Sequence, residues 1–154
     1  MLKLRKNKKG FTLVELIVVI AIMAVLAGVV AGVTVSQLNK QTNKTGVTQA
    51  KTIADFISTV ALTGENDDTA GDDYQILNAN GAFDSDKLNA LITAQYKAAS
   101  ITVTYSATVP TSFEAGKIAV YLSNGVVHVK YTKKGNTGDE AEYTVATTGV
   151  VSKV

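Results

Sequence analysis

The residues with the clearest chemical meaning stand near the start of the chain, in the run KKGFTLVEL at positions 8–16. Gly10 lacks a side chain, so an extended backbone here can enter a narrow protease cleft that any Cβ would obstruct. Glu15 is a carboxylate within an apolar run, which costs about 2.5–3.5 kcal/mol on membrane insertion unless it finds a partner. Cleavage after Gly10 would create an ammonium group on Phe11. That group and the Glu15 carboxylate of another subunit would then neutralise each other in a dry interface.

A plainer interpretation of Glu15 is a side chain that reaches the headgroups at the mouth of an ordinary membrane anchor. The surrounding sequence favours the first interpretation. An ordinary secretory signal has an apolar stretch of about 7 to 15 residues with a small-residue cleavage site behind it. Here the apolar stretch is longer, and only the poor site Val30-Ala31-Gly32 lies within it. The unusual residues stand in front of the apolar stretch instead.

The element that must position these residues is a long apolar helix. Residues 16–33 are all apolar or glycine, and a helix over 11–35 would span about 37 Å at about 1.5 Å per residue, enough to cross a bilayer. Residues 1–10 carry five basic side chains and no acid, which predicts a cytoplasmic start and an external remainder. The sequence therefore predicts a basic leader over 1–10, a membrane-spanning helix over 11–35 and a globular head over 36–154.

KKGFTLVEL followed by this apolar run resembles the class III signal of type IV prepilins and pseudopilins, over residues 6–38. In that family a membrane aspartyl peptidase cuts after the glycine and methylates the new amino terminus. The resemblance implies that Gly10 supplies the scissile carbonyl and that Phe11 becomes the N-methylated first residue. It also implies that Glu15 is the acidic residue used in subunit assembly.

The resemblance implies a precursor in the cytoplasmic membrane that later becomes part of a filament at the cell surface. Its implied partners are identical subunits, the prepilin peptidase, an assembly ATPase and a membrane platform protein. The joint presence of Phe11 and Glu15 favours a shaft subunit of a type IV pilus. Two alternatives stay open: a pseudopilin of a type II secretion or DNA-uptake machine, and a membrane-anchored binding or enzymatic domain in which Glu15 is incidental. Adhesion, twitching motility, DNA uptake and secretion are all compatible with a pilus subunit or a pseudopilin.

Small residues recur every four positions in the apolar helix, at Ala24, Gly28 and Gly32. They share one face, and this spacing allows close approach of a neighbouring helix. Two glycines also weaken a helix by about 1 kcal/mol each relative to alanine, so local unwinding over 28–32 is a second possibility. We favour helix packing.

The head is predicted to begin with the continuation of the same helix. An apolar stripe at helical spacing predicts a face that packs on a core and a helix that ends at Gly64, with Gly46 as a possible bend. The stripe consists of Val47, Ala50, Ile53, Ala54, Ile57, Val60 and Ala61. Residues 64–82 are predicted to form a loop. After it, Asp84-Ser85-Asp86 predict the cap of a short helix that turns Leu88, Leu91, Ile92 and Tyr96 inward.

Strands are predicted from residue 100 onward. Residues 101–105 alternate apolar and polar side chains up to the break at Pro110, and Asn124-Gly125 predicts a two-residue hairpin turn. The predicted hairpin pairs are Leu122 with Val127, Val120 with Val129 and Ile118 with Tyr131, which leaves Ala119, Tyr121, His128 and Lys130 on the other face. Residues 143–145 and 150–154 add one or two strands. The expected fold is α+β, with the helix packed on an antiparallel sheet of about four strands.

Three further groups were considered as sites in the head. His128 is expected on the outward sheet face without a catalytic constellation, so we expect neither an enzyme nor a cofactor. Asp67, Asp68, Asp72 and Asp73 do not match the spacing of an EF-hand loop, and a solvated loop is favoured over a calcium site. The basic patch of Lys130, Lys133 and Lys134 is expected to be a solvated hairpin end, because no aromatic residues accompany it in the pattern of a nucleic-acid groove.

Composition agrees with these expectations. Without the five basic residues of the leader, ten basic and thirteen acidic residues remain, so the body has no general attraction for nucleic acid. The chain has no cysteine, which excludes disulfides and thiolate chemistry. An exported small domain without disulfides depends on its core or on neighbouring subunits for stability, which fits an assembled protein.

Overall fold

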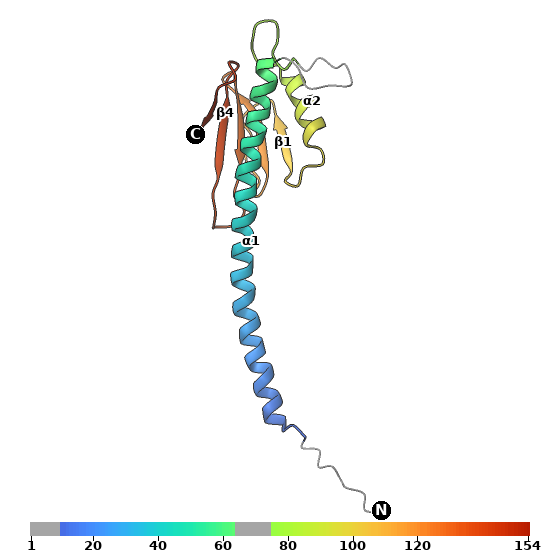
Figure 1. Cartoon of the computed structure of the whole chain (residues 1–154), viewed down its shortest axis with the longest axis vertical. Coiled ribbons are helices and arrows are strands. Elements are labelled where there is room, and N and C mark those ends of the chain that lie inside the picture. Colours follow the sequence, from blue (N-terminus) through green and yellow to red (C-terminus); the bar gives the residue numbers. More distant parts are fainter. Residues whose placement is uncertain (1–9, 64–74) are drawn as a thin grey trace, which may run out of the picture. The chain divides into compact units, whose positions relative to one another are not determined.

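The structure is a computed structural model that describes residues 10–63 and 75–154. It divides into two compact units at the bond between Gln37 and Leu38. We call residues 10–37 the N-terminal unit and residues 38–154 the head unit. Helix α1 (Leu13–Thr63) contributes to both, and it is followed in the head unit by α2 (Ser85–Tyr96) and five strands (Figure 1).

The strands form one sheet in the order β1-β2-β3-β4-β5. Their bounds are β1 Val103–Ser106, β2 Ile118–Ser123, β3 Val126–Tyr131, β4 Ala141–Val145 and β5 Val151–Lys153. The α+β fold class is confirmed. The sheet is mixed, however, because β1 runs parallel to β2 while the other pairs are antiparallel. The expectation of about four strands, all antiparallel, is therefore wrong in the number of strands and in the direction of β1.

The β2–β3 hairpin has the predicted register. Leu122 pairs with Val127, Val120 with Val129, and Ile118 with Tyr131. The turn residues Asn124 and Gly125 both have positive φ, 51° and 76°, as a type I′ turn requires. The inward side chains are accordingly buried, with Ile118, Val120, Val127, Val129 and Tyr131 fully enclosed.

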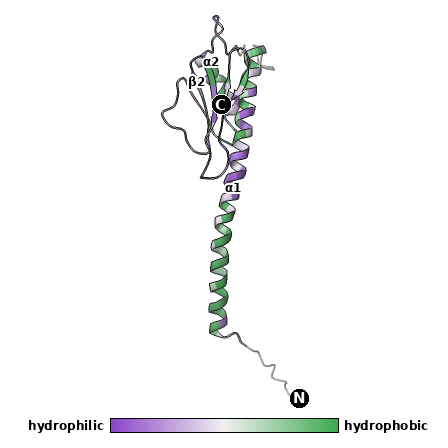
Figure 2. Cartoon of the chain, turned by 90° about the vertical axis from the view of Figure 1, so that its left-hand side faces the viewer, coloured by the Kyte–Doolittle hydropathy of each residue, from purple (hydrophilic) through white to green (hydrophobic). Residues whose placement is uncertain are grey.

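The core lies between this sheet and the part of α1 that belongs to the head unit. The predicted stripe is confirmed: its central residues Ala50, Ile53, Ala54, Ile57 and Val60 are buried, and Val47 and Ala61 are partly buried against the core. Figure 2 shows this part of α1 with alternating hydrophobic and hydrophilic residues, whereas residues before it are almost uniformly hydrophobic. The change in pattern marks where α1 begins to pack on a core.

Helix α2 is capped as expected. The carboxylate of Asp84 accepts hydrogen bonds from the backbone N–H of Asp86 and Lys87 at 3.0 and 3.2 Å. Leu88, Leu91 and Ile92 are buried, and the half-buried Tyr96 makes an edge-to-face contact with Phe56 of α1. The cap and the apolar face together place α2 against β1.

Gly46 does not interrupt α1, which is helical through this position. It is buried instead, and a Cβ added to it would overlap the ring of Tyr131 on β3. The glycine is therefore explained by close approach of helix and sheet. The expected end of the helix at Gly64 lies just outside the described residues, since α1 is described to Thr63.

Candidate functional site

The start of α1 forms a reciprocal cap between Thr12 and Glu15. The Thr12 backbone N–H and hydroxyl both donate to Glu15 Oε2, at 2.8 and 2.9 Å, and the Glu15 N–H donates to the Thr12 hydroxyl at 3.3 Å. This is the capping-box arrangement, which satisfies N–H groups that the first turn of a helix leaves unpaired. One oxygen of the Glu15 carboxylate is thus held at the helix end by its own chain.

Sequence reasoning missed the role of Thr12. The signal was present, because a threonine followed three residues later by glutamate and then by an apolar run is a known helix start. Gly10 and Phe11 lie just before the helix, and Phe11 is 92% exposed. The pairing of Glu15 with the amine of another copy's Phe11 stays a prediction.

The apolar part of α1 is exposed along its length. The large apolar side chains from Leu13 to Val35 are each at least half exposed. The most apolar stretch of the helix has a mean hydropathy of 3.0, and none of it is buried. By length and composition this helix is suited to cross a membrane. In water the exposed surface would be unfavourable, so this part of α1 needs lipid or protein around it.

The small-residue face lies within this exposed part. A Cβ added at Gly28 or Gly32 would meet no atom within 4 Å, and Ala24 is exposed as well. The helix is continuous through residues 28–32, so the chain by itself shows no unwinding there. Neither glycine has a packing role inside the N-terminal unit, which leaves their face open to another helix.

The outward face of the sheet carries a polar cluster centred on Glu142 of β4. Its Oε1 accepts from the Tyr121 hydroxyl at 2.7 Å and lies 2.8 Å from His128 Nδ1, and its Oε2 lies 3.2 Å from Lys130 Nζ. Burial alone would raise the pKa of Glu142, but the bonds from these three side chains outweigh it and lower the pKa. Burial and the bond to Glu142 raise the pKa of Tyr121.

His128 is on the predicted outward face, and the carboxylate of Glu142 lies against its ring, a contact that the sequence pattern did not predict. Its ring stacks on Tyr121 at 4.9 Å, and Tyr121 is only 5% exposed. The residues that connect β1 to β2 cause this burial: Phe113 packs on Tyr121 at 5.7 Å, with Lys130 Nζ 4.6 Å from the Phe113 ring centre. The connection between two parallel strands therefore covers part of the outward face.

The predicted basic patch is split by these contacts. Lys130 pairs with Glu142, whereas Lys133 and Lys134 belong to the segment 132–140 that packs against α1. Asn43, which is fully buried, holds this segment: its Nδ2 donates to the carbonyls of Lys134 and Thr137, and its Oδ1 accepts from Lys134 N–H and the Tyr131 hydroxyl. Sequence reasoning did not identify Asn43.

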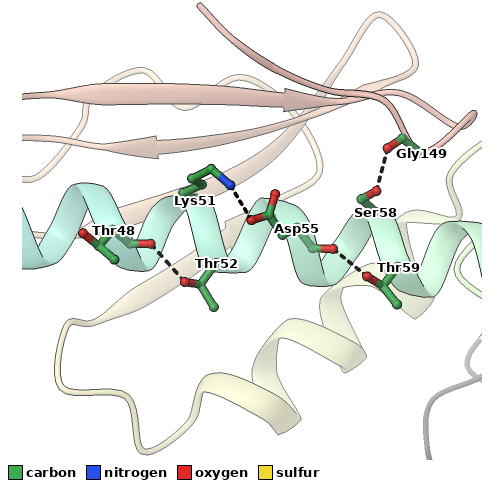
Figure 3. A network of polar contacts seen from close by, with 7 residues as sticks. All are labelled: Thr48, Lys51, Thr52, Asp55, Ser58, Thr59 and Gly149. Carbon is green, nitrogen blue, oxygen red and sulfur yellow. Dashed lines mark hydrogen bonds and ion pairs between the residues drawn. The ribbon is translucent and has the colours of Figure 1, made fainter.

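A second polar tether joins α1 to the β4–β5 turn, fifteen residues further along the helix. The Ser58 hydroxyl donates to the Gly149 carbonyl at 2.6 Å (Figure 3). Gly149 has a φ of 77° and lies so close to Leu62 that a Cβ would clash with that side chain. Asn43 and Ser58 together fix the register of the helix on the sheet.

The described residues contain no group of three or more His, Cys, Asp or Glu side chains that could hold a metal ion. The acidic residues Asp67, Asp68, Asp72 and Asp73 lie outside the described part of the chain. The structure therefore directs attention to the N-terminal helix and its first turn.

Comparison with known proteins agrees with this focus. Residues 5–31 match the family model described as the prokaryotic N-terminal methylation motif. The matched range includes the Gly10–Phe11 junction, Glu15 and most of the exposed apolar helix. No curated protein and no solved structure matches the chain. Residues 5–31 thus carry the N-terminal methylation motif, which is the class III signal of type IV pilins and pseudopilins.

Proposed function

We propose that this chain is the precursor of a shaft subunit of a type IV pilus, cut after Gly10 and N-methylated at Phe11. The observation that carries the proposal is the methylation motif at residues 5–31, directly joined to an exposed apolar helix. The head adds no catalytic constellation among its described residues, so we propose a structural role without enzymatic activity. The partners are identical copies, the prepilin peptidase, an assembly ATPase and a membrane platform protein.

The geometry of the helix start suggests how the cut promotes assembly. Cleavage removes the five basic residues that hold the leader in the cytoplasm and creates an amine on Phe11. Thr12 binds Glu15 Oε2, while Oε1 makes no hydrogen bond within the described residues. This oxygen is available to the amine of a second copy. The charge pair then forms in the dry interface where each unpaired charge would be most costly.

The packing of copies uses the exposed apolar surface of residues 13–35. In the membrane this surface contacts lipid, and in the filament it contacts the same surface of other copies. The face of Ala24, Gly28 and Gly32 allows the closest approach. The heads then lie outside this helical bundle.

The first test is mass spectrometry of the mature protein. We expect a terminus at Phe11 that carries one methyl group. A retained Met1, or a terminus after Gly32, would support an ordinary anchor with a binding or enzymatic head and would contradict the proposal.

The second test is Glu15→Gln. Glutamine keeps the reciprocal cap with Thr12 but removes the charge, so α1 should still begin at Leu13. We expect normal cleavage and a loss of surface filaments by electron microscopy. Normal filaments from this variant would show that the charge is dispensable.

Deletion of the gene separates pilus from pseudopilus. Long surface filaments that disappear on deletion support the pilus. Loss of export of a secreted enzyme, or of DNA uptake, without long filaments supports the pseudopilin alternative.

A further inference from the structure

The sheet of the head unit ends in two strands that have a neighbouring strand on only one side among the described residues. β1 forms one end of the sheet and β5 the other, and Figure 1 shows β1 and the C-terminus on opposite sides of it. The open edge of an end strand carries unpaired N–H and C=O groups, which can pair with a strand of another chain. The one proline of the chain, Pro110, is in neither strand, so every residue of both strands keeps its N–H.

Hydrogen bonds show which groups of β1 point to its open edge. The Thr102 carbonyl accepts from the Ile118 N–H at 3.0 Å, so position 102 faces β2. Alternate residues of a strand turn their backbone groups to opposite edges. The N–H and C=O groups of Val103 and Tyr105 therefore point away from β2.

β5 is open in the same way. The Val154 N–H donates to the Glu142 carbonyl at 2.9 Å, so position 154 faces β4, and by alternation so does position 152. Val151 and Lys153 therefore turn their N–H and C=O groups to the open edge. Each end strand thus offers two residues with free backbone donors and acceptors.

The two open edges are complementary in direction. β1, β2 and β4 run one way along the sheet, and β3 and β5 run the other way. Neighbouring copies in a helical filament point in the same direction along it. β5 of one copy therefore meets β1 of the next copy antiparallel, which is the more stable pairing.

The directions of the side chains also match. Val103 pairs with the buried Ile118, and Val151 pairs with the buried Val145. The open-edge residues of both strands therefore have their side chains on the core face of the sheet. The pleat can then continue from one copy into the next.

One register uses every open backbone group of both strands. It pairs Val103 with Lys153 and Tyr105 with Val151. Thr104 then lies opposite Ser152 on the outward face. A shift by two residues would leave only one of the two hydrogen-bonded pairs, so this register is the expected one.

A hollow of about 270 Å³ beside β1 has room for the Lys153 side chain that this register brings. Tyr96, the last residue of α2, lines the hollow together with Val103, which lies opposite Lys153. A tyrosine ring and the C-terminal end of a helix both attract a cation. The last turn of α2 holds no basic side chain, although the exposed Lys97 follows it and would repel Lys153 weakly.

We propose that β5 of one copy pairs with β1 of the next copy and joins their sheets. The inference rests on the proposed filament function, which supplies copies that point in one direction. The contact is heterologous, because each copy uses one edge for one neighbour and the other edge for the next, so it repeats without closing. It is short, since β1 has four residues and β5 three, and it adds register to a filament that the apolar helices hold together.

A disulfide tests the register directly, because the chain has no cysteine of its own. Thr104→Cys and Ser152→Cys change exposed positions, and they are made in separate copies that are produced together in the same cells. In the proposed pairing the two positions form a non-hydrogen-bonded antiparallel pair with Cα atoms about 4.5 Å apart, within the range of a disulfide. Mild oxidation of sheared filaments should yield a dimer, sensitive to reductant, only when both variants are present.

Such a disulfide must join two copies. Within one chain, β1 and β5 are four strand spacings apart, which is about 19 Å at about 4.8 Å each. The matched control pairs Ser152→Cys with Lys87→Cys, an exposed position in the first turn of α2, and should yield no dimer.

Substitutions at Lys153 separate backbone pairing from charge. Lys153→Pro removes an N–H that points to the open edge and should lower the dimer yield about fivefold or more. Lys153→Ala keeps this N–H and removes the ammonium group, so it should lower the yield only about twofold. Lys97→Glu should raise the yield about two- to fivefold, but not in combination with Lys153→Ala. The urea midpoint of each variant's head should be unchanged, which separates loss of the contact from loss of folding.

The outcomes separate this inference from the proposed function. Filaments with the mature Phe11 terminus but without a dimer between positions 104 and 152 would overturn the inference and leave the proposed function standing. A dimer from Thr104→Cys alone would mean that β1 pairs with β1 of another copy, and the inference would be wrong. A chain that keeps its leader and forms no filament would overturn the proposed function itself.

Discussion

At the scale of single residues, Asn43 shows how one polar side chain organises the head unit. Its amide is fully buried, yet both its nitrogen and its oxygen are satisfied by two hydrogen bonds each. The partners come from β3 and from the segment that follows it. A buried amide is tolerated only with such complete pairing, since an unpaired one carries a large desolvation cost.

Asn43→Ala should therefore lower the free energy of unfolding of the head by about 2–4 kcal/mol, because it leaves several buried groups without partners. Urea unfolding of the full chain in detergent micelles would measure this. The near-ultraviolet circular dichroism of tyrosine reports on the head alone, since all six tyrosines follow residue 63. Thr48→Ala is the matched control, because the Thr48 hydroxyl is exposed and bonds only within α1. Equal effects of the two changes would refute the role of Asn43.

Glu142 makes the stability of the head depend on pH. Its partners hold its pKa below the ordinary value of 4.5. A carboxyl group with a lowered folded-state pKa contributes stability that is present above its unfolded pKa and is lost as the pH falls through the folded value. We expect the urea concentration at the unfolding midpoint of the head to decrease as the pH is lowered below about 4.5.

Glu142→Gln should lower the midpoint at pH 7 and flatten this acid dependence. The control Glu114→Gln changes an exposed carboxylate that pairs only with Lys117 in the described structure, and it should leave the acid dependence almost intact. An acid profile that is the same in Glu142→Gln and the unaltered chain would exclude Glu142 as its origin.

The residues found only in the structure share one property. The partners of Asn43 lie about ninety positions away in the chain, and Glu142 meets Tyr121 and His128 only after three strands have paired. A local sequence pattern gives no information about such long-range contacts. Gly10, Phe11 and Glu15, in contrast, form a contiguous motif. The capping bond from Thr12 was also local and was within reach of sequence reasoning.

At the scale of secondary structure, local patterns predicted the elements well where they were periodic. The stripe on α1, the Asp84 cap and the Asn124-Gly125 turn each predicted the observed element, because each is a short-range effect of spacing or turn geometry. The parallel pairing of β1 was missed. Parallel neighbours usually need a long crossover, often a helix, whereas residues 107–117 make this connection without one.

Gly46 tests whether close packing or helix flexibility explains a glycine inside α1. At an open helical site, alanine in place of glycine stabilises by about 1 kcal/mol. At position 46 the added methyl group would overlap the buried Tyr131 ring, so we expect Gly46→Ala to destabilise the head by about 1–3 kcal/mol. Gly28→Ala is the matched control, since its Cβ would meet no atom within 4 Å. A gain in head stability from Gly46→Ala would mean that the glycine serves flexibility.

At the scale of the whole molecule, the two units bury their apolar residues in different ways. The head unit encloses its own core, with twelve large side chains among its described residues almost wholly removed from solvent. The N-terminal unit encloses none of its most apolar stretch. The exposed apolar helix of such a chain must be covered by its surroundings, which in the proposed function are lipid before assembly and other copies afterwards.

The small-residue face of Ala24, Gly28 and Gly32 allows a test of whether the exposed apolar helix packs against other copies. Gly28→Leu adds a side chain that meets nothing inside the chain, and leucine is well tolerated in membrane helices, so membrane insertion and cleavage after Gly10 should be unchanged. Two helices that approach through this face would be forced apart by the added volume, and surface filaments should be lost. Val30→Leu is the control, because position 30 lies on nearly the opposite side of the helix and is already large and exposed. Immunoblots of sheared filaments and of the membrane fraction separate the two steps. Normal filaments from Gly28→Leu would place the helix contact on another face, whereas loss of cleavage would mean that the glycine acts before assembly.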